Sequence, residues 1–230
     1  MVRQTYFITG TDTDSGKTVV AAGILSLAAR HGLRTLAMKP LASGCHATSE
    51  GLRNADALHL QSAMTESMHY DALNPVALEP AIAPHVAAAE AGRQVSANRL
   101  AGFCRGAMTR PCDLLLVEGA GGWRVPLNER ETWSDLVREL DLPVVLVVGL
   151  KLGCINHALL STEAVRQDGL RLAGWVANRC TAEPMEREDE TFECLRERID
   201  APCMGRVPWL ASGHGFPPAE AVASHLSFPV

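Results

Sequence analysis

The chain has 230 residues and a formal net charge of -5; 47% of its residues are hydrophobic, but only 5% are aromatic. It is long enough to bury a substantial core, and its acidity argues against nucleic acid or an anionic membrane as the main partner. No stretch is long and apolar enough for a membrane span, and the N-terminus lacks the layout of a signal peptide. The seven cysteines form no CxxC pair. Reduced thiols and a cytoplasmic protein are therefore expected.

Short apolar runs alternate with longer helix-like segments along the chain. We predict strands at residues 6–9, 35–38, 114–117, 144–148, 173–177 and 203–207. Helices are predicted at residues 18–30, 55–63, 96–108, 134–140, 155–167 and 185–199, with Ser96 and Ser134 as N-caps. Several strands are apolar on consecutive residues, as in LLLV and VVLVV, which is typical of strands covered on both faces. The order predicts an α/β fold of three layers, a mostly parallel central sheet with helices on both faces.

No repeat, low-complexity tract or linker divides the sequence, so we expect a single domain over residues 1–230. Irregular structure is expected at residues 70–92 and in a tail from about residue 211, where glycine and proline are frequent. In a parallel sheet of this kind, ligands collect at the carboxyl ends of the strands. Candidate functional residues are therefore those that follow each predicted strand.

Lysine is rare in this chain and is placed in a consistent way. Only Lys17, Lys39 and Lys151 are present, against 18 arginines. Each of the three lies at or just beyond the carboxyl end of a predicted strand. Lysine and arginine differ in shape, hydration and ease of deprotonation, so these positions are expected to need an ammonium group. Chance survival of three lysines is the alternative, which their shared placement disfavours.

The turn after the first predicted strand, residues 10–18 (GTDTDSGKT), joins a strand to a helix and ends in Gly-Lys-Thr. This is the layout of a nucleotide phosphate loop, in which backbone N–H groups and a helix N-terminus attract phosphate oxygens. The two glycines are one residue further apart than in the common motif. We expect Lys17 to reach the β- and γ-phosphates and the Thr18 hydroxyl to bind Mg²⁺, in a P-loop NTPase-like fold.

Two acidic residues are candidates for further ligands of Mg²⁺, which prefers oxygen atoms and commonly takes one or two carboxylates with water and phosphate. Glu118 ends the strand-like run LLLVEG, and Asp56 lies at the start of a predicted helix. Glu118 is alternatively a buried acid bonded to nearby glycine amides. Asp56 is favourable in a first helical turn without any metal. The residues alone leave both alternatives open.

Three further segments carry polar groups at strand ends. Lys39 is placed to neutralise charge that moves with the γ-phosphoryl group, or to be a solvated cation. Residues 151–156 open a helix whose first N–H groups suit a carboxylate. Asn178 is able to read a base edge, or to form an ordinary turn. His157 is expected to be a helix-face residue and not a catalyst.

Seven motifs in this chain resemble those of the dethiobiotin synthetase family, in the family's order. They lie at residues 10–18, 39–44 (KPLASG), 51–56 (GLRNAD), 117–123 (VEGAGGW), 148–157, 173–178 and 207–210. The resemblance implies ATP- and Mg²⁺-dependent ring closure of 7,8-diaminononanoate with CO2 or bicarbonate to dethiobiotin, ADP and phosphate. The route would run through a carbamate and a carbamic-phosphoric anhydride. It also implies a homodimer in which the partner subunit holds the substrate's tail carboxylate, with no nucleic acid or membrane partner.

The resemblance also implies roles for individual residues. Catalysis would involve Thr13, Lys17 and Lys39. ATP would be bound by Asp14, Ser15, Gly16, Lys17, Thr18, Val19, Asp56, Glu118, Gly119, Ala120, Gly121, Asn178, Arg179, Pro208, Trp209 and Leu210. The diamine would contact Ser43, Lys151, Leu152, Gly153, Cys154, Ile155 and Asn156. Mg²⁺ would be held by Thr18, Asp56 and Glu118.

The sequence departs from the family's pattern at a few positions. Asp14 stands where glutamate is common, and Ser15 stands where valine is usual. The segment after Leu210 lacks the acidic residue expected near the ribose or base. The sequence therefore indicates phosphate binding more directly than nucleotide selectivity.

Three other functions fit the sequence less well. A partition or division-site ATPase carries a signature lysine five residues before the loop lysine, where this chain has Asp12. An amidotransferase of cobalamin-type precursors would need a glutaminase domain, for which 230 residues leave little room. A nucleotide-binding module without chemistry has no use for Lys39, Ser43 and Lys151 together.

Overall fold

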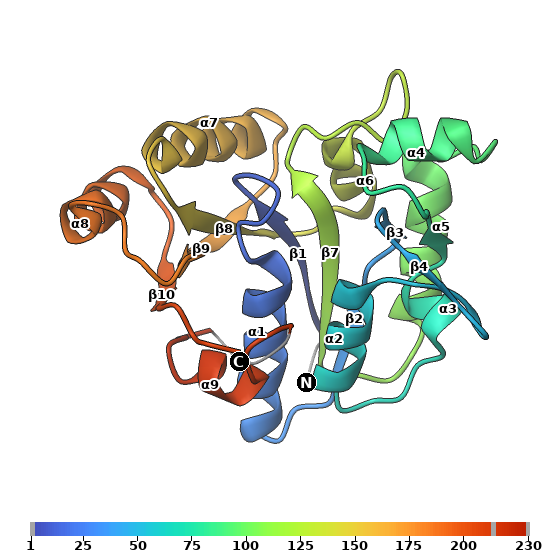
Figure 1. Cartoon of the computed structure of the whole chain (residues 1–230), viewed down its shortest axis with the longest axis horizontal. Coiled ribbons are helices and arrows are strands. Elements are labelled where there is room, and N and C mark those ends of the chain that lie inside the picture. The colour runs from blue at the N-terminus through green and yellow to red at the C-terminus, as the bar shows by residue number, and fades with distance from the viewer. Residues whose placement is uncertain (1–2, 213–214, 229–230) are drawn as a thin grey trace.

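The computed structural model describes residues 3–212 and 215–228, and a six-stranded sheet runs through its centre with helices on both faces (Figure 1). The strand order is β10-β9-β8-β1-β7-β2, and every pairing of neighbours is parallel. The strands are β1 (Gln4–Gly10), β2 (Thr35–Met38), β7 (Leu114–Gly122), β8 (Val144–Leu150), β9 (Leu172–Arg179) and β10 (Cys203–Val207). This arrangement confirms the predicted α/β fold class.

The long helices lie where they were predicted, with small shifts at their ends. They are α1 (Lys17–Arg30), α2 (Ala55–Ala63), α5 (Ala97–Met108), α6 (Trp133–Leu140), α7 (Cys154–Gln167) and α8 (Glu188–Arg198). Ser96 caps α5 as predicted, because its hydroxyl accepts the N–H of Arg99 at 3.2 Å. The prediction that Ser134 caps α6 was wrong. Thr132 is the N-cap, in a capping box with Asp135, and Ser134 lies inside the helix.

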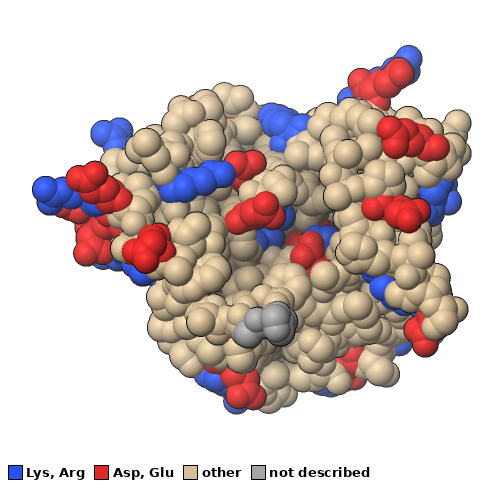
Figure 2. Space-filling view, viewed as in Figure 1, with Lys and Arg blue, Asp and Glu red and all other residues tan. Residues whose placement is uncertain are grey.

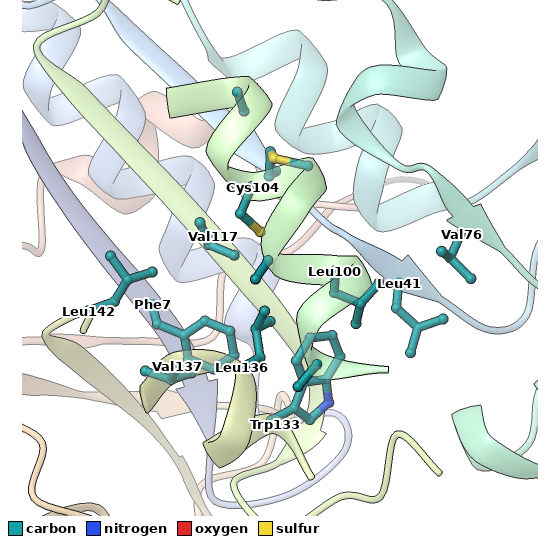
Figure 3. Packing of buried hydrophobic residues seen from close by; sticks show 14 of the residues in the cluster. Phe7, Leu41, Val76, Leu100, Cys104, Val117, Trp133, Leu136, Val137 and Leu142 are labelled. Atoms are coloured by element: carbon teal, nitrogen blue, oxygen red, sulfur yellow. The ribbon is translucent and has the colours of Figure 1, made fainter. Parts of the chain in front are cut away.

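Strand β1 is buried on both faces from Tyr6 onward, which explains its three consecutive apolar residues, Tyr6, Phe7 and Ile8. Tyr6 and Ile8 belong to the core under α1. Phe7 points to the other face, where its ring lies 5.8 Å from that of Trp133. Figure 3 shows this second core, in which the Phe7 ring lies beside Leu136 and Val137 of α6, with Trp133 of the same helix near it. Both layers therefore exclude water from the sheet.

Residues 70–92 were predicted to be irregular, but they contain three short elements. These are α3 (Tyr70–Leu73), β6 (Val76–Ala77) and α4 (Pro84–Glu90). β6 pairs with β3 (Leu41–Ala42), and β4 (His46–Thr48) pairs with β5 (Gly51–Arg53). Elements this short span too few residues to show a periodic pattern in the sequence. They were therefore not predicted.

The tail after residue 211 was also expected to be irregular, but it contains α9 (Ala219–Ala223), which packs on α1. Gly23 of α1 permits this contact, because a Cβ atom there would lie 2.5 Å from Cγ1 of Val222. Arg30 Nη2 donates to the carbonyl of Glu220 at 2.6 Å. The family's pattern has an acidic residue after the position of Leu210. Two residues of that segment in this chain, Gly213 and His214, lie outside the described residues.

Within residues 3–212 and 215–228, no helix combines the length and apolarity that crossing a membrane requires.

Candidate active site

A cavity of about 910 Å³ opens at the carboxyl ends of the central strands. Its walls come from the phosphate loop before α1, from the segments after β2, β7, β9 and β10, and from the start of α2. Figure 2 shows the hollow near the centre of the face, with acidic and basic side chains together inside it. This is the edge of the sheet at which a parallel α/β fold binds ligands.

Most of the predicted site residues line this cavity. They are Thr13, Asp14, Gly16, Lys17, Thr18, Val19, Lys39, Ser43, Asp56, Ala120, Gly121, Asn178, Arg179, Pro208, Trp209 and Leu210. Glu118 lies beneath its floor, fully buried. Ser15 and Gly119 lie in the same segments without facing the cavity. Residues 151–156 lie outside it.

The phosphate loop is held in shape by a contact from β9. Gly16, the residue before α1, has φ of 89°, which favours glycine. A Cβ atom on Gly16 would lie 2.0 Å from Nδ2 of Asn178, and this nitrogen donates to the carbonyl of Ser15 at 3.1 Å. The structure thus gives Asn178 a bond to the loop backbone, which the sequence did not predict.

Lys17 begins α1 and is nearly buried. Its Nζ donates to the carbonyl of Asp12 at 3.0 Å, within the loop itself. Burial lowers the pKa of Lys17, and the neighbouring Lys39 lowers it further, while Glu118 opposes the change. The ammonium group is therefore less strongly held in its charged form than that of an ordinary lysine.

Lys39 lies between two carboxylates at the floor of the cavity. Its Nζ is 2.5 Å from Glu118 Oε1 and 2.8 Å from Asp56 Oδ2. Thr18 donates its hydroxyl to the same Glu118 oxygen at 2.8 Å. Burial works against the charge on Lys39, but Glu118 and Asp56 outweigh it and raise its pKa. Burial also opposes the charge on Asp56, but Lys39 holds the pKa of that carboxyl below its usual value.

Helix α3 positions this cluster from behind. The side-chain amide of Asn74 donates to the carbonyl of Lys39 at 2.7 Å, and the N–H of Lys39 donates to the carbonyl of Leu73 at 3.0 Å. The hydroxyl of Tyr70 accepts the N–H of Asn54, the N-cap of α2, at 2.6 Å. The main chains around Lys39 and at the start of α2 are thus tied to one short helix. Sequence analysis missed Asn74 and Tyr70, since no local pattern marks a bond between distant positions.

We expect Asn74→Ala to lower the free energy of unfolding by about 1–3 kcal/mol, because it leaves the buried carbonyl of Lys39 without a donor. Chemical denaturation measures this value. Asn98→Ala is the matched control, because Asn98 is exposed and its amide bonds Glu139, which is itself partly exposed. If the two variants were equally stable, the bond to Lys39 would have no structural importance.

The residues predicted to bind Mg²⁺ fit such an ion. Among the described residues, Glu118 Oε2 is buried and has no hydrogen-bond partner. A buried polar atom without a partner is costly, and a carboxylate oxygen suits a hard cation. The described chain holds no cluster of three or more His, Cys, Asp or Glu side chains able to bind a metal. An ion at Thr18, Asp56 and Glu118 would therefore need phosphate or water as further ligands.

Lys151 lies on the other side of the phosphate loop. Its Nζ is 2.6 Å from Asp12 Oδ2, and both side chains are about half exposed. The hydrogen bond to Lys151 lowers the pKa of Asp12, and the same bond raises the pKa of Lys151. The pair borders a smaller cavity of about 420 Å³. Within one chain, Lys151 is thus separated from Ser43 and the Lys39 cluster.

A buried acid that the sequence analysis did not consider holds Arg179 in place. Glu188, at the start of α8, accepts bonds from Arg179 Nη2 and from Arg206 Nη2, each at 2.7 Å. Burial opposes the charge on Glu188, but the two arginines lower the pKa of its carboxyl. Several charged residues flank Glu188 in the sequence. That pattern is typical of a solvent-exposed helix start, so nothing in the sequence marks Glu188 as a buried acid.

Apolar residues complete the cavity wall, and the sequence analysis missed these as well. Pro84 begins α4, Ile82 lies in the segment before that helix, and Val125 comes from the segment after β7. Phe216 comes from the tail, where its ring stacks on His59 at 4.3 Å. The cavity thus joins a charged floor to partly apolar walls.

Comparison with known proteins gives close relatives over almost the whole chain. The family described as AAA domain matches residues 4–214. The ATP-dependent dethiobiotin synthetase BioD of Marinobacter nauticus is 61% identical, over 91% of this chain and 90% of its own length. The protein of the same name from Cellvibrio japonicus is 56% identical, over 98% of this chain and 96% of its own length.

Two solved structures share the fold at low sequence identity. A ParA family ATPase from Chlorobium tepidum has a TM-score of 0.57 and 14% identity, covering 98% of this chain and 91% of that chain. The septum site-determining protein MinD complexed with Mg-ADP, from Pyrococcus horikoshii, has a TM-score of 0.53 and 16% identity, covering 89% of this chain and 82% of that chain. These likenesses show a P-loop NTPase-like fold and nothing about the reaction.

Proposed function

The chain belongs to the family of ATP-dependent dethiobiotin synthetases, and we propose that the cavity at the carboxyl edge of its sheet is where the reaction takes place. The enzyme is an ATP-dependent cyclo-ligase of biotin synthesis, and 7,8-diaminononanoate, CO2 and ATP are its substrates. The observation that carries the assignment of the site is the contact of Thr18, Lys39, Asp56 and Glu118 beside the phosphate loop. Positive charge and hard oxygen ligands are gathered where two anionic reactants must meet.

The phosphate loop would bind the triphosphate of ATP. Residues 14–19 place the N-terminus of α1 and the Lys17 ammonium at one side of the cavity, and both attract phosphate oxygens. The wall that continues from Asn178, which contacts the loop, to Pro208, Trp209 and Leu210 is left for the ribose and base. Ala120 and Gly121 line the cavity on the β7 side of the loop.

Mg²⁺ would be held by Thr18, Asp56 and Glu118, and the buried unpartnered Oε2 of Glu118 supports this assignment. When bound, the ion neutralises charge on the β- and γ-phosphates. The remaining ligands would come from the nucleotide and water, as is usual for Mg²⁺.

Ring closure would follow from the placement of Lys39, Thr13 and Ser43 around the cavity. One amine of the diamine adds to CO2 and loses a proton, which gives a carbamate. A carbamate oxygen attacks the γ-phosphorus, and the bond from that phosphorus to ADP breaks. The second amine then attacks the carbonyl carbon, and phosphate leaves as the cyclic urea closes. The ammonium of Lys39 would hold the anionic carbamate next to the anionic nucleotide. It would thereby orient the two reactants and stabilise the negative charge between them.

The tail of the diamine would be bound by a second copy of the chain. We assign this role to the helix start at residues 151–156, which lies outside the main cavity of its own chain. Leu152 is 92% exposed and Leu160, two turns along α7, is 56% exposed. Large exposed apolar side chains beside a candidate carboxylate site support a homodimer contact at α7. Sedimentation of Leu160→Glu beside the unchanged chain tests that contact.

Nucleotide affinity is expected to weaken with rising pH before an ordinary lysine would titrate. Burial lowers the pKa of Lys17 from 10.5, and phosphate binds the charged form. Affinity is therefore full below the pKa of Lys17 in the free protein and falls as the pH rises through it. Titration of Mg-ATP at several alkaline pH values measures this. In Lys17→Arg the cation stays charged, so a decline of equal steepness in that variant would assign the effect to another group.

The decisive experiment incubates the protein with 7,8-diaminononanoate, bicarbonate and Mg-ATP and looks for dethiobiotin by mass spectrometry. Omission of the diamine is the control. ATP hydrolysis without the diamine, and no dethiobiotin with it, would favour a switch ATPase of the same fold. Asp12, at the position of the signature lysine of that class, already argues against such a switch.

A further inference from the structure

The ammonium group of Lys39 occupies the position between the two carboxylates that are proposed to hold Mg²⁺. Its Nζ lies 2.5 Å from Glu118 Oε1 and 2.8 Å from Asp56 Oδ2. A magnesium ion held by Asp56 and by the unpartnered Oε2 of Glu118 would lie close to this ammonium, so the two cations would repel each other and compete for the same two carboxylates. The third proposed ligand is also engaged, because Thr18 donates its hydroxyl to Glu118 Oε1.

The pairing of Lys39 with these carboxylates is built into the core of the site. Lys39 is 3% exposed and Glu118 is 0% exposed. In the described part of the chain, Glu118 and Asp56 are the carboxylates in salt-bridge contact with Lys39. Buried charges are stable only when they are paired. A cation that displaced the ammonium from both carboxylates would leave Lys39 buried without a partner.

The balance of charge distinguishes a free metal ion from a metal–nucleotide complex. Lys17 and Lys39 carry two positive charges, and Asp56 and Glu118 carry two negative ones, within one cluster in which Asp56 alone is partly exposed. A divalent cation alone would add an uncompensated charge at low effective dielectric constant. The nucleotide brings phosphate oxygens that give both lysines new partners, and it brings further ligands for the metal.

We infer that Lys39 excludes free divalent cations from the site, so that the metal enters only together with the nucleotide. The inference rests on the proposed function, since that proposal supplies the metal ligands. It gives Lys39 a task before catalysis, which is to hold the side chains of Asp56 and Glu118 oriented for the incoming metal–nucleotide complex. It also predicts that removal of the ammonium creates a binding site for free metal.

The test is a titration with Mn²⁺ alone, followed by calorimetry, in the absence of nucleotide. The unchanged chain is compared with Lys39→Met and with the double variant Lys39→Met/Asp56→Asn. Methionine has a similar length to lysine and carries no oxygen that could itself bind the ion. Lys39→Met is expected to bind Mn²⁺ roughly tenfold or more tightly than the unchanged chain, and the double variant is expected to lose that gain. Circular dichroism shows that each variant is folded.

The other possible results overturn the inference, and they show whether the proposed metal site is overturned with it. Equal binding of Mn²⁺ by the unchanged chain and Lys39→Met would overturn the role of Lys39 and leave the metal ligands standing. Failure of both proteins to bind Mn²⁺ with a non-hydrolysable ATP analogue would overturn the inference together with the proposed metal site. If Lys39→Met does not fold, the melting temperature of the unchanged chain decides. Mn²⁺ alone should leave it unchanged and Mn²⁺ with the analogue should raise it, so a rise with Mn²⁺ alone would overturn the inference.

Discussion

Replacing Lys39 with glutamine is expected to lower turnover by about two to three orders of magnitude while leaving the affinity for Mg-ATP within a few-fold of its original value. Removal of one group that stabilises a developing charge commonly has an effect of roughly this size. Lys39 lies across the cavity floor from the start of α1, where the phosphate loop and Lys17 remain intact. Steady-state formation of dethiobiotin and calorimetric binding of Mg-ATP are the two measurements.

Lys151→Gln is the matched control for this variant, because it also removes an ammonium from the carboxyl end of a strand of the same sheet. Lys151 is half exposed and pairs with Asp12 outside the main cavity. Its loss is therefore expected to raise the KM for the diamine more than it lowers kcat. Undiminished turnover in Lys39→Gln would show that Lys39 has no role in catalysis. The stability of Lys39→Gln must be measured as well, since Glu118 stays buried in that variant without its ammonium partner.

The features that the sequence predicted well are those set by local pattern. Unbroken apolar runs at residues 114–117 and 144–148 predicted strands covered on both faces, and the structure has them as β7 and β8. The Gly-Lys-Thr turn predicted the loop that ends at Gly16 and Lys17. The capping of α6 shows the limit of such patterns, because Thr132 and Ser134 both carry a hydroxyl and only the backbone geometry selects Thr132.

The contacts within the site depend on the order of the strands in the sheet. Local sequence patterns do not reveal that order. β1 lies between β7 and β8, so the phosphate loop has Lys39 and Glu118 on one side and Lys151 on the other. The rule that ligands collect at strand ends brings all three lysines to one edge but not to one cavity. The bond from Asn74 to Lys39 likewise joins segments that are far apart in the chain.

Glu118→Gln is expected to lower the free energy of unfolding by roughly 3–5 kcal/mol, because it leaves the buried ammonium of Lys39 with one charged partner. Asp56→Asn is the matched control, with an expected cost of roughly 1 kcal/mol, because its side chain is 36% exposed and water replaces part of the lost interaction. Chemical denaturation near neutral pH measures both. Both variants should also need more Mg²⁺ for half-maximal turnover, since each removes a proposed ligand.

The dependence on pH tests whether the charge on Asp56 stabilises the fold. Lys39 lowers the pKa of Asp56 below 3.8, so the carboxylate contributes stability above pH 3.8 and loses it as the pH falls through its folded value. Lys39 has a raised pKa, so its contribution is full below pH 10.5 and is lost only above it. The stability difference between Asp56→Asn and the unchanged chain should therefore be constant at intermediate pH and shrink in acid. A flat difference down into acid would show that the charge on Asp56 does not stabilise the fold, and an unchanged metal titration would show that Asp56 is not a metal ligand.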